Sequence, residues 1–331
     1  MSKKHVQAEA GERARLELTF DKPNLLGMVF GQYDQNLVAI ENRLGVYIGA
    51  RGNKLQIEGE AEAAARARDV LTGLYNRVAK GQELDTGAVE AVIAMSAEPT
   101  LDGIIRHDVS EPPKIMIRTR KKTIVPRSAT QGVYMEQLAR EDVIFALGPA
   151  GTGKTYLAVA QAVSQLITGS VDRLILSRPA VEAGERLGFL PGDMKEKVDP
   201  YLRPLYDALY DTLPAEQVER RIASGEIEIA PLAFMRGRTL ANAFIILDEA
   251  QNTTQAQMKM FLTRFGEGSR MVICGDPRQV DLPVPGGSGL ADAVDKLEGL
   301  EGIGVVRFGV ADVVRHPVVG RIVQAYEGPD A

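Results

Sequence analysis

The strongest chemical signal in the sequence is a glycine-rich segment, GPAGTGKT, at residues 148–155. It follows a short apolar run, residues 142–147, and precedes an amphipathic run, residues 156–167. This is the pattern GxxxxGK[ST] between a strand and a helix, where glycines let backbone N–H groups point inward around phosphates. The N-terminus of the following helix adds partial positive charge. We therefore expect this segment to bind the phosphates of a nucleotide.

Within this segment we expect Lys154 to neutralise phosphate charge and the Thr155 hydroxyl to help hold Mg²⁺. The alternative is a glycine-rich turn with a surface lysine, which the strand and helix on either side disfavour. The residues expected to contact the nucleotide here are Gly148, Pro149, Ala150, Gly151, Thr152, Gly153, Lys154, Thr155 and Tyr156.

A second apolar run supplies the carboxylates that a magnesium nucleotide requires. Residues 243–247 read as a strand buried on both faces, and Asp248 and Glu249 follow it directly. We expect Asp248 to bind Mg²⁺ through a water molecule and Glu249 to polarise the attacking water. Alone, such a strand end would be a solvated turn about as often as a site. Its pairing with the glycine-rich segment favours the site.

A third apolar run, residues 271–274, ends in the segment GDPRQ at residues 275–279. A glutamine at the carboxyl edge of a sheet can reach a γ-phosphate, so we expect Gln279 to sense it. The alternative is a simple Gly-Asp-Pro turn. We expect Cys274, at the end of the run, to be buried packing.

These residues must be positioned by a parallel α/β sheet with helices on both faces, the P-loop NTPase fold class, which we expect over residues 128–331. Parallel strands that are buried on both faces read as continuous apolar runs. The strands are expected near residues 143–147, 172–176, 226–230, 243–248, 271–275 and 304–308.

A separate small α+β domain is expected at residues 13–83, after a flexible terminus at residues 1–12. The order is strand, two helices, two strands joined by a turn at residues 51–53, and a long helix at 61–79. This order resembles a KH-type RNA-binding module, whose GxxG loop clamps a nucleic-acid backbone. Here the corresponding loop, residues 31–34, ends in Asp34 in place of glycine. The KH-like domain either contacts RNA or serves as a docking module.

Between the two domains we expect a linker at residues 84–127. It contains Pro112 and Pro113, which disfavour a continuous helix. Its end, residues 114–127, holds six basic residues and no acidic one.

Composition excludes several classes of protein. The single cysteine and three scattered histidines exclude a disulfide scaffold and a zinc finger. No apolar run approaches the roughly 18 residues needed to span a bilayer, and the start lacks a signal peptide, so we expect a cytoplasmic protein with no membrane contact. The net charge of −5 requires any nucleic-acid contact to be local.

The segments GPAGTGKT, LDEAQ and CGDPRQ, in this order, resemble the first motor core of superfamily 1 helicases. Residues 177–180 (SRPA), 185–193 (ERLGFLPGD) and 313–317 (VVRHP) are similar to the PhoH family in particular. The resemblance covers about residues 128–327 and implies ATP binding and hydrolysis with Mg²⁺, in the setting of RNA metabolism.

The resemblance also bears on three further candidate residues, of which Arg178 and Arg315 lie within the segments quoted above. Gln131 would contact adenine, as the upstream glutamine of such helicases does; the alternative is an exposed polar residue before a helix. Arg178 and Arg315 are both candidates for stabilising charge on the γ-phosphoryl group. Because the chain has room for one motor core where a helicase has two, we expect a homo-oligomer, with a hexameric ring as one candidate.

Two functions remain open from the sequence. One is a helicase-like RNA ATPase, and the other is a nucleotide-switched RNA adaptor for a partner endoribonuclease or the ribosome. A small-molecule kinase fits poorly, because such kinases avoid a water-activating Glu after the metal-binding Asp. The charged segment at residues 182–213 is expected to face the substrate or a neighbouring subunit, or else to be a solvated helical insertion.

Overall fold

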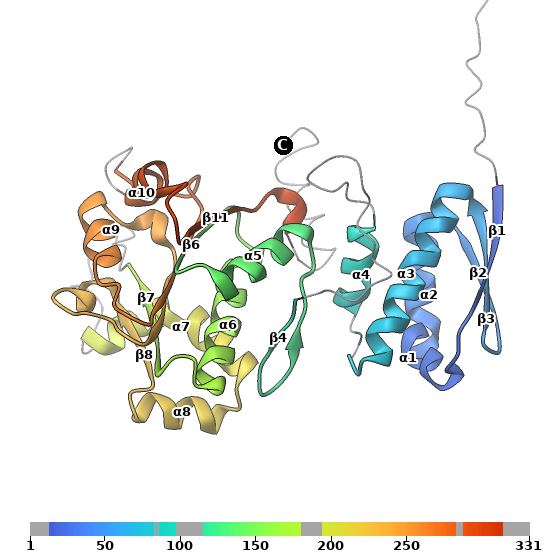
Figure 1. Cartoon of the computed structure of the whole chain (residues 1–331), viewed down its shortest axis with the longest axis horizontal. Coiled ribbons are helices and arrows are strands. Elements are labelled where there is room, and N and C mark those ends of the chain that lie inside the picture. Colours follow the sequence, from blue (N-terminus) through green and yellow to red (C-terminus); the bar gives the residue numbers. More distant parts are fainter. Residues whose placement is uncertain are drawn as a thin grey trace, which may run out of the picture. The chain divides into compact units, whose positions relative to one another are not determined.

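The structure is a computed structural model that describes residues 13–82, 84, 86–96, 115–179, 194–282 and 287–313. The chain divides into two compact units. The first extends to Lys114 and includes Arg127–Ala129, and the second comprises Ile115–Pro126 and the chain from Thr130 onward. Figure 1 draws both units with their elements labelled. Among the described residues, no helix combines the length and the apolar character needed to cross a membrane.

The first unit is a three-stranded antiparallel sheet, in the order β1-β3-β2, with helices packed on one face. The apolar side chains of the sheet and the helices form one core, which includes Leu55, Ile57, Val70 and Leu74. Its elements are β1 (Arg13–Thr19), η1 (Pro23–Leu25), α1 (Leu26–Phe30), η2 (Gln32–Asp34), α2 (Gln35–Leu44), β2 (Tyr47–Arg51), β3 (Lys54–Glu60), α3 (Ala61–Ala79) and α4 (Thr86–Met95). The small α+β unit is as predicted, and its likeness to a KH module stays a prediction.

The loop that the KH resemblance singled out has an unusual backbone. Gly31 has φ +76°, and both Tyr33 and Asp34 adopt left-handed conformations at φ +54° and +56°. The Tyr33 side chain is 91% exposed, and Asp34 is exposed beside it. The turn between β2 and β3 favours glycine at position 52, because Gly52 has φ +62°. The neighbouring Asn53 donates from its side chain to the Phe20 carbonyl.

The second unit is built on a parallel sheet of six strands among the described residues, in the order β11-β6-β10-β9-β7-β8. The fold-class prediction is therefore confirmed, and each expected strand lies within two residues of its predicted position. The strands are β6 (Val143–Leu147), β7 (Arg173–Arg178), β8 (Ile227–Pro231), β9 (Ala243–Leu247), β10 (Arg270–Gly275) and β11 (Ile303–Arg307).

Alternate residues of these strands enter cores on opposite faces, as the pleat of a strand requires. Phe244 and Ile246 of β9 join the core on one face, while Ile245 and Leu247 join the other. The first face is covered by α5 (Ala129–Arg140), α6 (Lys154–Thr168), α7 (Met194–Thr212) and α8 (Ala215–Ala223). The second is covered by α9 (Gln255–Leu262) and α10 (Gly289–Leu297), both labelled in Figure 1, and by η4 (Leu232–Met235).

The predicted linker, residues 84–127, differs from the structure because it contains ordered elements. Helix α4 packs into the core of the first unit through Val89, Val92 and Ile93. A short antiparallel hairpin, β4 (Ile117–Arg118) and β5 (Thr123–Ile124), packs against the core of the second unit. The basic stretch at the end of the predicted linker is therefore largely part of the second unit.

Candidate functional site

The glycine-rich segment forms a loop between β6 and the N-terminus of α6. Gly148, Gly151 and Gly153 have positive φ angles of 138°, 84° and 85°, which favour glycine. A Cβ atom added to Gly148 would meet the backbone oxygen of Phe308 at 2.4 Å, so no larger residue fits there. The loop is therefore shaped by backbone conformations that its glycines permit, and it surrounds the side chain of Lys154.

Lys154 lies at the centre of this loop and is only 9% exposed. Its ammonium group donates to the carbonyls of Gly148 and Pro149 at 2.7 and 2.8 Å, and to the Thr152 hydroxyl at 3.3 Å. Burial lowers the pKa of Lys154, while nearby acidic groups such as Asp276 and Asp248 act in the opposite direction. The loop thus holds one buried positive charge, oriented by the oxygens of the loop.

The structure brings Thr155 and Asp248 together, although they are far apart in the sequence. Asp248 directly follows β9, and the Thr155 hydroxyl donates to its Oδ1 at 2.6 Å. Burial raises the pKa of Asp248, and the charge of Glu249 adds to this effect, whereas the Thr155 hydrogen bond and Arg178 oppose it. A hydroxyl and a carboxylate are oxygen ligands of the kind that bind Mg²⁺, and a lysine beside them can contact the phosphates that the metal bridges.

Glu249 is held by two neighbours. Its Oε1 lies 2.9 Å from Nη2 of Arg178, and its Oε2 accepts from Nε2 of Gln251 at 2.5 Å. Glu249 also has a left-handed backbone, with φ +51°. A non-glycine residue in this conformation costs about 1–3 kcal/mol and persists where its surroundings impose it. The structure therefore fixes the Glu249 carboxylate at the edge of the sheet between an arginine and a glutamine.

Gln251 connects this carboxylate to the loop after β10, and sequence reasoning missed it. Its side chain is 1% exposed and bridges the two segments, because its Oε1 accepts from the backbone N–H of Asp276 at 3.1 Å. The available signal was its place in LDEAQ, three residues after Asp248. In the same loop, Gln279 is exposed and its backbone N–H donates to the Asp276 carbonyl.

Gln131 is buried, so it is not the exposed polar residue of the alternative interpretation. It is 4% exposed in α5, and its amide nitrogen donates to the Thr152 carbonyl at 2.9 Å. Its contact with adenine stays a prediction. Tyr134, one turn later, was not predicted: it is fully buried and donates to the Lys154 carbonyl at 3.1 Å. Two side chains of helix α5 therefore donate hydrogen bonds to backbone carbonyls of the loop.

Arg315, the other candidate arginine, lies outside the described residues.

A cavity of about 550 Å³ opens over this edge of the sheet. Most of the predicted site residues line it, namely Ala150, Gly151, Gly153, Lys154, Thr155, Tyr156, Arg178, Asp248, Glu249 and Gln279. Helix α7 supplies a further wall through Pro204, Asp207, Ala208 and Asp211, none of which was predicted individually. These residues fall in the segment 182–213, whose first part lies outside the described residues.

Cys274 is fully buried beneath the loop, as expected for a packing residue. Its sulfur lies 3.8 Å from the Tyr134 hydroxyl. Burial raises the pKa of Cys274 to about 12, and the charge of Asp248 acts in the same direction. The thiol is therefore part of the buried layer that packs beneath the glycine-rich loop.

Comparison with known proteins gives a consistent result. A family model described as "PhoH-like protein" matches residues 123–327. The chain is 48% identical over 321 residues to a PhoH-like protein of Mycobacterium tuberculosis, covering 97% of this chain and 89% of that one. It is 49% identical over 299 residues to a PhoH-like protein of Bacillus subtilis, covering 90% and 93%. It is also 49% identical over 205 residues to Protein PhoH of Escherichia coli, covering 61% and 58%.

Proposed function

The chain belongs to the PhoH family, and from this premise we propose that it is a Mg²⁺-dependent ATPase that acts in RNA metabolism. The observation that carries the proposal is the hydrogen bond between Thr155 and Asp248 beside the buried Lys154. The loop glycines, the lysine and this hydroxyl–carboxylate pair match the chemistry of a magnesium nucleotide. When bound, Mg²⁺ would neutralise charge on the phosphates.

In this proposal each residue has a defined task. Lys154 gives up its contacts with the loop carbonyls and donates to phosphate oxygens. Thr155 and Asp248 hold the metal, and Gln279 reaches the γ-phosphate across the cavity that both it and Lys154 line. Glu249 accepts a proton from the attacking water. Arg178 donates to a γ-phosphate oxygen, either with N–H groups that do not face Glu249 or after its pair with that carboxylate opens.

The test is a pair of variants that separates binding from turnover. Glu249→Gln should retain nucleotide affinity and abolish hydrolysis, because it removes the proton acceptor without removing a phosphate ligand. Lys154→Ala should weaken ATP binding itself, by about 10- to 100-fold for the loss of charge-assisted hydrogen bonds. Normal turnover in Glu249→Gln would refute the assigned role of Glu249.

A second function, a nucleotide-switched RNA adaptor, is favoured by one observation. Both oxygens of Glu249 are engaged, one by Arg178 and one by Gln251. Nucleotide binding that draws Arg178 away would free the Glu249 carboxylate and move the end of β7, which would switch a surface without rapid turnover. A motor should show RNA-stimulated hydrolysis and strand separation. An adaptor should bind RNA, an endoribonuclease or the ribosome in a nucleotide-dependent way without unwinding.

The proposal includes a homo-oligomer as the active form. The arginine that completes the site on the γ-phosphate would come from Arg178, from Arg315 or from a neighbouring subunit. Light scattering alongside the turnover assay tests this: full ATPase activity in a monomer would argue against a shared site.

A further inference from the structure

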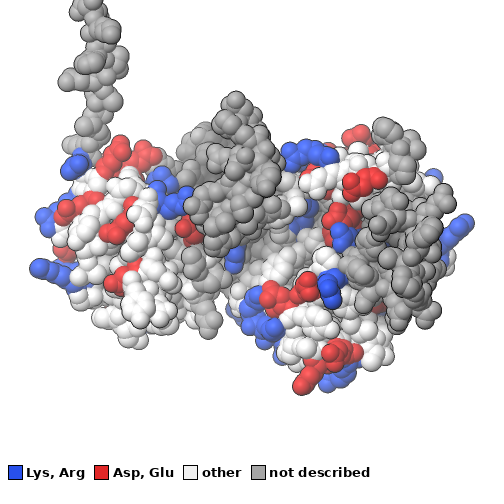
Figure 2. Space-filling view, turned by 180° about the vertical axis from the view of Figure 1, so that it is seen from behind, with Lys and Arg blue, Asp and Glu red and all other residues white. Residues whose placement is uncertain are grey.

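The β4–β5 hairpin is the most basic short segment of the second unit. Residues 115–126 contain four basic residues, Arg118, Arg120, Lys121 and Lys122, and no acidic one. On the face drawn in Figure 2, by contrast, Lys and Arg are interspersed with Asp and Glu over the described surface of both units. A site for a polyanion on this acidic chain must therefore be local, and this hairpin is a local concentration of positive charge.

The hairpin is anchored to the core by its apolar face. Ile117 pairs with Ile124, and these side chains are 2% and 8% exposed within the core that also holds α6 and α7. Strand alternation places the paired Arg118 and Thr123 on the outer face. The turn is closed by the Thr119 N–H and hydroxyl, which donate to the Lys122 carbonyl at 3.0 and 2.9 Å. The basic residues thus sit on a fixed turn.

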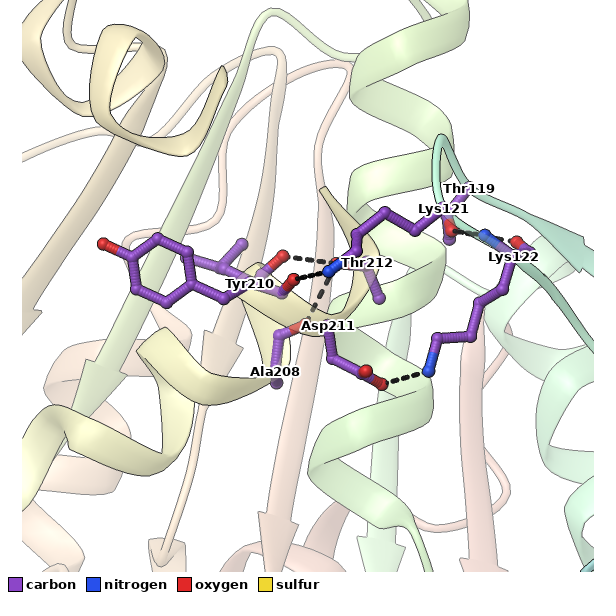
Figure 3. Close-up of polar contacts among 8 residues, drawn as sticks. Thr119, Lys121, Lys122, Ala208, Tyr210, Asp211 and Thr212 are labelled. Atoms are coloured by element: carbon purple, nitrogen blue, oxygen red, sulfur yellow. Dashed lines mark hydrogen bonds and ion pairs between the residues drawn. The ribbon is translucent and has the colours of Figure 1, made fainter. Parts of the chain in front are cut away.

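Two of the four cations fasten the hairpin to α7, as Figure 3 shows. Lys121 donates to the Tyr210 carbonyl at 2.7 Å, in the last turn of the helix, where positive charge is favourable. Lys122 pairs with Asp211 at 2.5 Å and also lies 5.8 Å from the centre of the Tyr156 ring. Because Asp211 and Tyr156 line the cavity, the hairpin is held beside it.

The other two cations, Arg118 and Arg120, are exposed and point charge to solvent. Arg118 contacts only the Met116 sulfur among its described polar neighbours, at 3.9 Å, and neither guanidinium is paired with a carboxylate of the part of the chain that the structure describes. Several surface cations elsewhere in this unit are paired, such as Arg307 with Glu298 and Lys296 with Asp292. The two arginines therefore present forked donors that no carboxylate of the described residues neutralises.

We propose that the β4–β5 hairpin is a nucleic-acid-binding arm, in which Arg118 and Arg120 contact the phosphodiester backbone of RNA. A guanidinium matches two phosphate oxygens at once, and contacts of this kind position a strand without reading its sequence. The hairpin supplies the rigidity, because Ile117, Ile124, Lys121 and Lys122 fix it to the unit. This inference rests on the proposed function and assigns its RNA contact to a defined element.

The test compares matched double variants of the full chain. Arg118→Ala/Arg120→Ala removes the two exposed guanidiniums. Arg236→Ala/Lys259→Ala removes the same charge from exposed positions at the end of η4 and in α9, on the opposite face of the sheet. Binding is measured by fluorescence anisotropy with single-stranded RNA, and with DNA of the same sequence, between about 50 and 200 mM salt.

We expect the hairpin variant to lose at least about fivefold in affinity at low salt, and the slope of log affinity against log salt to fall by about 1.4, or 0.7 per lost phosphate contact. The control variant should bind like the original chain. ATP turnover without RNA should be equal in all three, which verifies folding. Arg118→Lys/Arg120→Lys keeps the charge but loses the forked donors, so it should recover the salt dependence and only part of the affinity. Equal binding of RNA and DNA supports contacts to the backbone alone.

Two results would overturn the proposal, and they differ from one another. If the original chain binds RNA and Arg118→Ala/Arg120→Ala binds equally well, or if Arg236→Ala/Lys259→Ala loses as much affinity as the hairpin variant, the arm is wrong while the proposed function stands. If the original chain binds neither RNA nor DNA, the RNA setting of the proposed function fails as well.

Discussion

Gln251 is one of the two residues that hold Glu249, beside Arg178. Its side chain joins Glu249 to the backbone of Asp276, and it is almost fully buried. Gln251→Ala should lower kcat by about 10- to 100-fold, because a displaced catalytic group of this kind costs that much. It should leave nucleotide affinity nearly unchanged, as measured by equilibrium titration beside steady-state turnover.

The matched control is Gln257→Ala in the exposed capping box of α9. This variant loses about 1 kcal/mol of stability and no turnover. An unchanged kcat in Gln251→Ala would show that the Gln251 hydrogen bond is not needed to position Glu249.

Cys274 provides a prediction about reactivity. Burial raises its pKa to about 12, and it is fully buried. Since the raised pKa keeps the thiol protonated at any pH below about 12, the native protein should react with a thiol reagent at pH 8 at least about 10³-fold more slowly than the unfolded protein, whose cysteine has a pKa near 8.5. The measurement is the rate of thiol modification with and without denaturant. Equal rates would mean that the buried layer beneath the loop is open to solvent.

At the scale of elements, the loop between β6 and α6 depends on the close approach of Gly148 to Phe308, the residue after β11. An added methyl group would meet the Phe308 carbonyl at 2.4 Å in a backbone that L-residues rarely adopt. Gly148→Ala should therefore abolish nucleotide binding and lower stability by about 2 kcal/mol or more. Gly132→Ala is the control, because it lies in α5 with its nearest contact at 3.9 Å and should be neutral or stabilising by up to about 1 kcal/mol.

The anchoring of the β4–β5 hairpin can be divided between its apolar and its charged contacts. Ile117 is 2% exposed, so Ile117→Ala should cost about 2–5 kcal/mol. Lys122→Gln breaks an exposed ion pair with Asp211 and should cost less than about 1 kcal/mol. Urea unfolding followed by a signal of the second unit measures both. A larger loss of unfolding free energy in Lys122→Gln than in Ile117→Ala would show that the ion pair, and not the apolar face, is the main anchor of the hairpin.

Across the whole molecule, the sequence predicts best where a segment is buried on both faces. The strands β6, β9 and β10 are continuous apolar runs ending at chemically distinct residues, so the strands and their order along the chain could be predicted. Helix α4 was missed because it is apolar on most sides and lacks the amphipathic period that marks a helix. The hairpin was missed because strands of two residues are too short to show alternation.

The side-chain contacts around the site could not be predicted from sequence patterns, because they join residues that are far apart in the sequence. Tyr134 meets Cys274 across 140 residues of sequence, and Gln251 meets Asp276 across 25. These contacts are created by the sheet order, which places β10 between β6 and β9. The motifs can be recognised in the sequence, but the side chains that contact them from distant segments are known only once the fold is known.

The central claim is that the loop around Lys154 binds a triphosphate whose magnesium is held by Thr155 and Asp248. Titration calorimetry of the full chain with ATP tests this most directly. We expect saturable binding that weakens when Mg²⁺ is omitted and falls by about 10- to 100-fold in Lys154→Ala. No heat of ATP binding, or the same affinity in Lys154→Ala, would contradict the account.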